Sequence, residues 1–385
     1  MTLRYLTSGE SHGQELLGII DGLPAGVELP EEAISRELAR RQKGHGRGGR
    51  MKIESDTARI VSGVRWGKTT GAPVGLVVKN RDWENWKERM SPDASDFGKA
   101  ETVTRPRPGH ADLSGMMKYG HDDARNVLER ASARETAMRV AVGAAARAML
   151  APFGISVVSW VLEIGGIRAE IKGKPSALFS RAEASPVRCP DEGASMNMVE
   201  VIDRAKKDGD SLGGVFEVTA LGVPPGLGTF ASRDLTLDGM LAGALMSIQA
   251  IKGVEIGIGF QAARLPGSAV HDGIFHGRNG YFRRTNNAGG IEGGMSNGEA
   301  IIIRAAMKPI PTLYKPLSSV DTKSHRAFKA SVERSDTCAV PAAAVVGEAA
   351  AAFVIAQAMR EKFGGDSLAE MRRNYDGYME QVRKF

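Results

Sequence analysis

Two short motifs recur at nearly the same spacing, and this repetition constrains the possible folds more than any other feature of the sequence. GESHG, which begins at Gly9, and the GLPAG that follows it recur 200 residues later as GDSLG and GVPPG. ERAS, which begins at Glu129, recurs 204 residues later as ERSD, and both copies precede an alanine-rich stretch. Self-similarity at a fixed offset indicates duplicated structural units. We therefore predict two similar halves, about 1–200 and 201–385, with chance recurrence of glycine- and alanine-rich words as the alternative.

The remaining pattern predicts a mixture of helices and short strands. Residues Glu31–Lys43 follow a proline, carry glutamates in the first turn and precede a glycine, which are the usual signs of a helix. Residues 126–150, after an opening turn, and 339–363 are alanine-rich and also predicted to be helical. Short apolar runs such as ELLGIID and GGVFEVTALG end at glycine or proline and predict strands. The polar stretch 80–104, which holds two tryptophans, is interpreted as an insertion or lid.

Composition favours a cytoplasmic protein without a membrane span or a metal site. The first ten residues contain no apolar signal core, and the longest apolar stretch is interrupted by Pro341 and Glu348. We expect that stretch to be a buried helix. The two cysteines, Cys189 and Cys338, are too few for a disulfide framework and have no companions at metal-ligand spacing.

The positive charge of the chain is concentrated in glycine-rich segments. The formal net charge is +6, and arginines gather in GHGRGGR and TRPRPGH. Arginine binds phosphate and carboxylate through two parallel hydrogen bonds, and glycine lets backbone N–H groups approach an anion. This clustering favours a small ligand with several negative charges, although any single arginine also fits a solvated surface position.

The first motif contains the Gly-x-Ser-x-Gly pattern of serine hydrolases, centred on Ser11. That pattern requires a strand before the serine and a helix after it. The following residues, ELLGIID, are apolar only as far as a glycine and a proline, so they predict a strand and a turn. A serine hydrolase is therefore kept only as an alternative function.

Three further patterns resemble nucleotide or nucleic-acid sites but have the wrong context. GHGRGG follows a predicted helix and precedes a strand, which is the reverse of the dinucleotide-binding order. GVRWGKT is one residue short of a phosphate-binding loop and is followed by a β-rich segment in place of the required helix. The arginine-glycine run is a single loop and not a long low-complexity segment. A nucleic-acid-binding protein remains the second alternative, and nucleic acid is not an expected partner.

Several long words along the whole chain resemble the chorismate synthase family. They are GESHG, RRQKGHGRGGRM, RPRPGHADL, ERASARET, GGMSNG, KPIPTLYKP and ERSD. Ala131 departs from the serine usual in the family but leaves Ser132–Arg134 intact. The resemblance implies one α+β domain over residues 1–385, in which antiparallel sheets flank a helical layer with an internal pseudo-two-fold repeat. It also implies a homotetramer.

The same resemblance implies a lyase of the shikimate pathway to aromatic amino acids. The reaction is the anti-1,4-elimination of phosphate from 5-enolpyruvylshikimate 3-phosphate, which yields chorismate and requires reduced FMN. NADPH serves as reductant in family members that reduce their own flavin. Since the chain has no extra domain, we expect a monofunctional enzyme that depends on a separate flavin reductase.

Roles for individual residues also follow from the resemblance. His110 is expected to protonate the leaving phosphate, His12 to protonate the reduced flavin, and Asp336 to help take that proton back. Without the family, His12 would be read as a structural histidine and Asp336 as a helix N-cap. The implied FMN-binding residues are Ser132, Ala133, Arg134, Gln249, Ala250, Gly293, Lys308, Pro309, Ile310, Pro311, Thr312 and Arg334, and those for NADP or substrate are Arg41, Arg47, Arg50 and Arg107.

Overall fold

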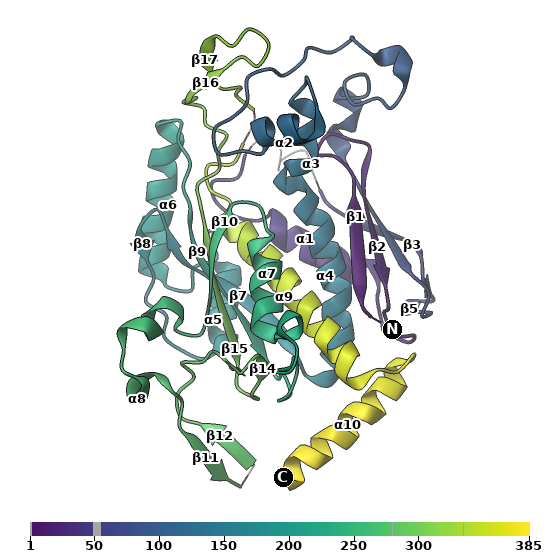
Figure 1. Ribbon diagram of the computed structural model, residues 1–385, viewed down its shortest axis with the longest axis vertical. Helices are drawn as coiled ribbons and strands as arrows, with labels where there is room; N and C mark the ends of the chain where they lie inside the picture. The colour runs from purple at the N-terminus through teal and green to yellow at the C-terminus, as the bar shows by residue number, and fades with distance from the viewer. Residues whose placement is uncertain (1, 49–54, 279, 334) are drawn as a thin grey trace.

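Two antiparallel sheets lie on opposite sides of a layer of helices (Figure 1). The computed structural model describes residues 2–48, 55–278, 280–333 and 335–385. The first sheet has the order β1-β2-β6-β3 and the second has the order β10-β15-β9-β7-β8. The predicted α+β fold, with sheets flanking helices, is confirmed. The strands are β1 (Arg4–Ser8), β2 (Glu15–Asp21), β3 (Ala58–Ser62), β6 (Val74–Lys79), β7 (Ser156–Ile164), β8 (Ile167–Arg168), β9 (Gly214–Leu221), β10 (Ile251–Ile256) and β15 (Ile301–Met307).

The central layer is built mainly from α1 (Glu31–Gln42), α4 (Thr136–Leu150), α7 (Leu237–Met246) and α9 (Val340–Phe363). Helices α4 and α9 approach closely because small residues face each other: a Cβ atom placed on Gly143 would lie 2.3 Å from the Cβ of Ala349. Helix α9 is long and apolar enough to cross a membrane by length and composition, yet most of it is buried inside the protein. Its buried position confirms the expected core helix.

The two sheets have the same connectivity. By place in the sheet, β1, β2, β6 and β3 correspond to β7, β9, β15 and β10. Helices α1 and α7 each follow the second strand of their sheet, and α4 and α9 each follow its last strand. This correspondence supports the predicted duplication, which remains a prediction. If the halves are equivalent, the division falls between α4 and β7, near residue 150 rather than residue 200.

One predicted helix is interrupted. The segment 126–150 forms α3 (Arg125–Ala131) and α4, which are separated by Ser132 in an extended conformation and by a short 3-10 turn, η4 (Ala133–Glu135). The Ser132 hydroxyl accepts a hydrogen bond from the Arg134 N–H, and this local bond replaces a helical one. The other two predicted helices are confirmed as α1 and α9, each beginning or ending within one residue of the expected bound.

A buried cluster of charged residues links three helices of this layer. Glu348, in the middle of α9, is fully buried and accepts hydrogen bonds from Arg40 of α1 at 2.7 and 2.9 Å, and from Arg147 of α4 at 2.6 Å. Arg188 and the Ser159 hydroxyl complete the shell of donors. Burial opposes ionisation, but the charges of Arg147 and Arg40 prevail and lower the pKa of Glu348 to about 2.

The remaining elements form insertions and arms around this core. The α-helices are α2 (Asp112–Tyr119), α5 (Pro175–Ala184), α6 (Glu192–Lys207), α8 (Gly267–Val270) and α10 (Leu368–Lys384), with 3-10 turns η2 (Arg81–Asn85), η3 (Ala94–Asp96), η5 (Ala151–Phe153), η6 (Arg233–Leu235) and η7 (Gly259–Arg264). The short strands are β4 (Val64–Arg65), β5 (Lys68–Thr69), β11 (Ile274–Gly277), β12 (Gly280–Arg283), β13 (Ile291–Glu292), β14 (Met295–Ser296), β16 (Ser318–Val320) and β17 (Ala327–Lys329).

Candidate active site

The turn that carries His12 is tight and is fastened to the junction between α3 and α4. Gly9 opens the turn with φ of 105°, and a Cβ atom there would lie 2.5 Å from the carbonyl oxygen of Glu15, so only glycine fits. The Ser11 N–H donates to the carbonyl of Glu129 at 3.0 Å, and the Ser132 hydroxyl donates to the Ser11 hydroxyl at 3.2 Å. Strand β2 follows the turn, so the helix that a nucleophilic serine requires is absent here.

His12 is held on two sides. Both carboxylate oxygens of Glu129 lie 3.0 Å from its Nδ1, and the His12 backbone N–H donates to the same carboxylate at 2.8 Å. The Trp86 ring stacks on the imidazole with centroids 3.9 Å apart, so the segment interpreted as a lid does reach this site. Burial opposes ionisation of Glu129, but the hydrogen bonds from His12 and the charge of Arg125 hold the pKa of Glu129 below its usual value.

A buried arginine group lies beside the α3–α4 junction. Arg41 donates to the Thr136 hydroxyl at 3.0 Å and to the Ala133 carbonyl at 2.9 Å, whereas its Nη1 makes no hydrogen bond among the described residues and lies 3.7 Å from Asp56 Oδ2. Burial and repulsion from Arg47 lower the pKa of Arg41 to about 9, which leaves the side chain charged at neutral pH. A buried cation with an unused donor is suited to bind an anion.

Asp336 and Arg47, which the resemblance placed in the site, contact each other directly. Arg47 Nη1 lies 2.9 Å from Asp336 Oδ2, and the Gly48 N–H donates to Asp336 Oδ1 at 2.6 Å. Helix α9 begins at Val340 and has no side-chain cap at Ala339. The carboxylate of Asp336 therefore binds the arginine-glycine loop instead of capping the helix.

His110 is anchored by a second buried carboxylate. Its Nδ1 lies 2.5 Å from Asp112 Oδ1, and Arg107 Nε donates to Asp112 Oδ2 at 2.9 Å. Burial opposes ionisation, but the hydrogen bonds from His110 and Arg107 hold the pKa of Asp112 well below its usual range. Arg107 also donates to the Thr312 hydroxyl at 2.8 Å, and Lys308 donates to the Gly109 carbonyl at 2.5 Å. The RPRPGH and KPIPT segments are thus brought together.

Ser331, Glu333 and Asp336 each contact one of the three groups. The Ser331 hydroxyl donates to the carbonyl of Arg105, two residues before Arg107. Glu333 accepts from Arg125 at 3.2 Å, and Arg125 also donates to Glu129 at 3.2 Å. Asp336 contacts Arg47, as described above. Residues close together near the C-terminal end of the chain therefore contact the groups around both histidines and around Arg47, and we refer to these groups together as the network.

Of the remaining predicted residues, several contact members of this network, Gly293 has no contact with it among the described residues, and two are not described. The side chain of Arg134 binds Asp56 at 2.7 Å and Asn80 at 2.8 Å, so its role in the site is partly structural. Gln249 donates to Glu135 at 3.2 Å, and its buried Oε1 has no partner among the described residues. Arg50 and Arg334 lie outside the described residues. Three other predicted residues act through backbone carbonyls: that of Ala133 accepts from Arg41, that of Ala250 from the Lys308 N–H, and that of Ile310 from the Ser211 hydroxyl. Pro309 and Pro311 flank Ile310 in the sequence. Gly293 lies in the turn between β13 and β14.

Two buried carboxylates, Glu129 and Asp112, and the Trp86 ring contact the histidines but were not predicted from the sequence. All three belong to segments that the sequence does single out: ERAS, RPRPGHADL and the polar stretch 80–104. Asp112 is two residues from His110, which is a detectable signal for a carboxylate–histidine pair. Glu129 is 117 positions from His12, and no local pattern indicates that contact.

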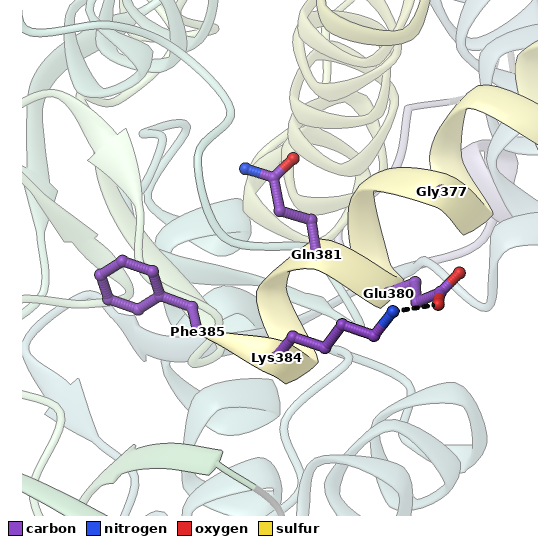
Figure 2. A pocket seen from close by; sticks show the side chains of 5 residues that line it. All are labelled: Gly377, Glu380, Gln381, Lys384 and Phe385. Carbon is purple, nitrogen blue, oxygen red and sulfur yellow. Dashed lines mark hydrogen bonds and ion pairs between the residues drawn. The ribbon is translucent and has the colours of Figure 1, made fainter.

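A pocket elsewhere in the chain carries no comparable chemistry. It lies at the end of α10, at the bottom of the view in Figure 1, whereas α2 and α3 lie at the top. Figure 2 shows its lining, in which Lys384 pairs with Glu380 at 2.6 Å beside Gln381 and Phe385. An exposed ion pair between residues one helical turn apart is an ordinary surface feature.

Comparisons with known proteins agree with this arrangement. A family model described as chorismate synthase matches residues 3–360. A chorismate synthase of Pelobacter propionicus is 62% identical, with 99% of each chain covered, and one of Trichlorobacter lovleyi is 60% identical, with 100% of each chain covered. A solved crystal structure of a chorismate synthase is 45% identical, covers 100% of this chain and 99% of its own, and superposes with a TM-score of 0.82.

Proposed function

The chain belongs to the chorismate synthase family, and from this premise we propose how its residues carry out the reaction. It is a carbon–oxygen lyase that eliminates phosphate from 5-enolpyruvylshikimate 3-phosphate to give chorismate, and it requires a reduced flavin. The observation that carries the assignment of roles is the pairing of two histidines with two buried carboxylates inside a group of buried arginines.

The arginines bind and neutralise the substrate. The substrate carries a phosphate and two carboxylates, and Arg41, Arg47 and Arg107 present buried or half-buried guanidinium groups to the same network. Hydrogen bonds between ionised partners are about twice as strong as neutral ones. The unused donor at Arg41 Nη1 supports its role as an anion ligand. Arg50 completes this set in our proposal.

His110 acts as the general acid for the leaving phosphate. Nδ1 lies against Asp112, and Nε2, which lies 3.4 Å from Arg107 Nη2, gives a proton to the phosphate oxygen as the C–O bond breaks. Arg107, which contacts both His110 and Asp112, keeps the ring in place. Positioned proton transfer of this kind contributes on the order of a hundredfold or more to the rate.

His12 and Asp336 control the protons on the cofactor side. We assign the flavin to FMN, and the buried Gln249 Oε1, which has no partner among the described residues, fits the need to bind a polar ring. When bound, reduced FMN supplies electron density for loss of the poorly acidic ring proton. Ser132, Ala133, Arg134, Ala250, Gly293, residues 308–312 and Arg334 complete its binding site in this proposal. His12 holds one proton for exchange at Nε2, and Asp336 takes a proton back.

Partners and location follow from the family. We propose a cytoplasmic homotetramer supplied with reduced FMN by a separate reductase, so that Arg41 and Arg47 bind substrate rather than NADPH. An exposed apolar sheet face supports assembly: Leu6 and Ile19 are opposite each other on the outer side of β1 and β2 and are 71% and 53% exposed.

An anaerobic assay tests this function. Purified protein, substrate and FMN are incubated with and without dithionite, and phosphate and chorismate are measured. We expect both products only when FMN is reduced, and we expect Ser11→Ala to remain folded and to bind FMN. Equal phosphate release in both conditions would support a hydrolase, and RNA binding tighter than FMN binding would support the nucleic-acid alternative.

A further inference from the structure

Glu129 makes a set of contacts to His12 that no role described so far explains. Its carboxylate accepts from the His12 backbone N–H at 2.8 Å and lies 3.0 Å from Nδ1 through both oxygens. The Glu129 carbonyl accepts from the Ser11 N–H at 3.0 Å. One residue of α3 therefore fixes both the backbone and the ring of the histidine. Glu129 is 1% exposed.

The surroundings keep this carboxylate charged. Arg125, one helical turn before Glu129, donates to it at 3.2 Å and lies over the Trp86 ring at 5.1 Å. Trp86 in turn stacks on His12 at an interplanar angle of 18°. The imidazole is thus confined by a carboxylate at one edge and an aromatic ring on one face. Uncompensated burial of a carboxylate is costly, so a buried glutamate in this position requires such partners.

We propose that Glu129 is the positioning residue of the cofactor-side acid–base group: it fixes His12 with Nδ1–H toward α3 and reserves Nε2 for proton exchange. This inference rests on the proposed role of His12. A carboxylate on one ring nitrogen determines the tautomer and the ring orientation of a histidine. Glu129 itself does not touch substrate or cofactor in this proposal.

The first test reads the imidazole directly, in protein without flavin. Protein labelled with ¹⁵N-histidine is examined by NMR, and the signals of His12 are identified from their loss in His12→Ala. We expect Glu129→Gln to change the Nδ1 and Nε2 shifts of His12 while the other histidine signals stay in place, and Glu129→Asp to restore them in part. Unchanged His12 shifts in Glu129→Gln would overturn the proposal.

The second test uses a double-mutant cycle with reduced FMN. Glu129→Gln is expected to lower kcat on the order of tenfold or more, with little change in the KM for substrate. Since Glu129 acts through His12, Glu129→Gln combined with His12→Ala should be no slower than His12→Ala alone. If the double variant instead shows the product of the two single-variant decreases in kcat, Glu129 has a role independent of His12.

Controls separate this inference from the proposed function and from misfolding. Glu361→Gln, at an exposed position on α9, is the matched charge-removing variant and should match the wild type in all assays. If the wild type makes no chorismate, the proposed function fails, whereas the NMR test still reports on Glu129. If the wild type is active and Glu129→Gln keeps its kcat, only the positioning role fails.

Discussion

The two histidines have similar anchors but different assignments, which makes them separable by substitution. His110 contacts Asp112 and Arg107, whereas His12 contacts Trp86 and Glu129. His110→Ala is expected to lower turnover on the order of a hundredfold and leave flavin affinity nearly unchanged. His12→Ala should change the absorbance of bound reduced FMN when substrate binds. A wild-type rate and flavin spectrum in His12→Ala would make this histidine structural.

Arg41 provides a second prediction at the residue scale. Its buried Nη1 makes no hydrogen bond among the described residues and lies 3.7 Å from Asp56 Oδ2, and its charge is disfavoured by burial and by Arg47, so a bound anion would stabilise that charge. We expect Arg41→Gln to raise the Kd for substrate roughly tenfold or more, since a hydrogen bond to a charged group contributes about 1.5–3 kcal/mol. Titration calorimetry measures this affinity. Arg36→Gln, exposed on the same helix, is the control and should bind substrate normally.

At the scale of elements, local patterns predicted most helices and strands but not their long-range contacts. A preceding proline, glutamates in the first turn and a following glycine identified α1, and alanine-rich composition identified α9. The break at Ser132 was not predicted, because alanine-rich flanks favour continuing the helix and only a side-chain hydrogen bond opposes it. The quoted motifs supplied the candidate site residues, whose roles remain predictions. Pairs such as His12 with Glu129 depend on which elements the fold brings together. The two residues are 117 positions apart, so no local sequence pattern predicts their contact.

Helix α9 gives a stability prediction through Glu348. This carboxylate is surrounded by Arg40, Arg147 and Arg188, and removing one partner of a buried ion group typically costs about 3–5 kcal/mol. We expect Glu348→Gln to lower the free energy of unfolding by about 3 kcal/mol in urea denaturation. Glu361→Gln, exposed on the same helix, should change it by less than about 0.5 kcal/mol. Equal stability of the two variants would contradict this role of Glu348.

The same residue predicts how stability depends on pH. Its pKa is lowered in the folded protein to about 2, so its stabilising effect is fully present above the pKa of the unfolded chain and is lost as pH falls toward 2. The wild type should therefore lose stability between about pH 5 and pH 2, and Glu348→Gln should lose less over that range. Parallel urea titrations at stepwise pH measure the difference. Identical pH dependence in both proteins would show that other carboxylates dominate.

At the scale of the whole molecule, the predicted duplication would account for a site that draws on both ends of the chain. The sheets share one strand order, and α4 and α9 pack against each other in the middle of the layer. The ERAS and ERSD segments precede these two helices, so equivalent positions in the two halves lie next to each other at one end of the layer. Glu129 and Glu333, which stand first in these two segments, both accept hydrogen bonds from Arg125, as the predicted duplication leads us to expect. A site formed between duplicated halves receives residues from both.

The outer face of the first sheet leads to a prediction about assembly. Leu6 and Ile19 are opposite each other in register on that face, with Leu17 and Val61 also exposed nearby in the sheet. An apolar sheet face of this kind marks an interaction site, and burying each such side chain contributes about 1.5–3 kcal/mol. In the proposed homotetramer we expect this face to be covered by a second copy. Leu6→Asp combined with Ile19→Asp should then dissociate the assembly into smaller species.

Sedimentation velocity measures this outcome, and circular dichroism verifies that the variant keeps its fold. Met196→Asp is the control because Met196 is an exposed apolar side chain on α6, on the far side of the second sheet (Figure 1). It should sediment like the wild type. A wild-type tetramer that persists in the Leu6 and Ile19 variant would place the interface on another surface. A wild type that is monomeric at micromolar concentration would refute the tetramer itself.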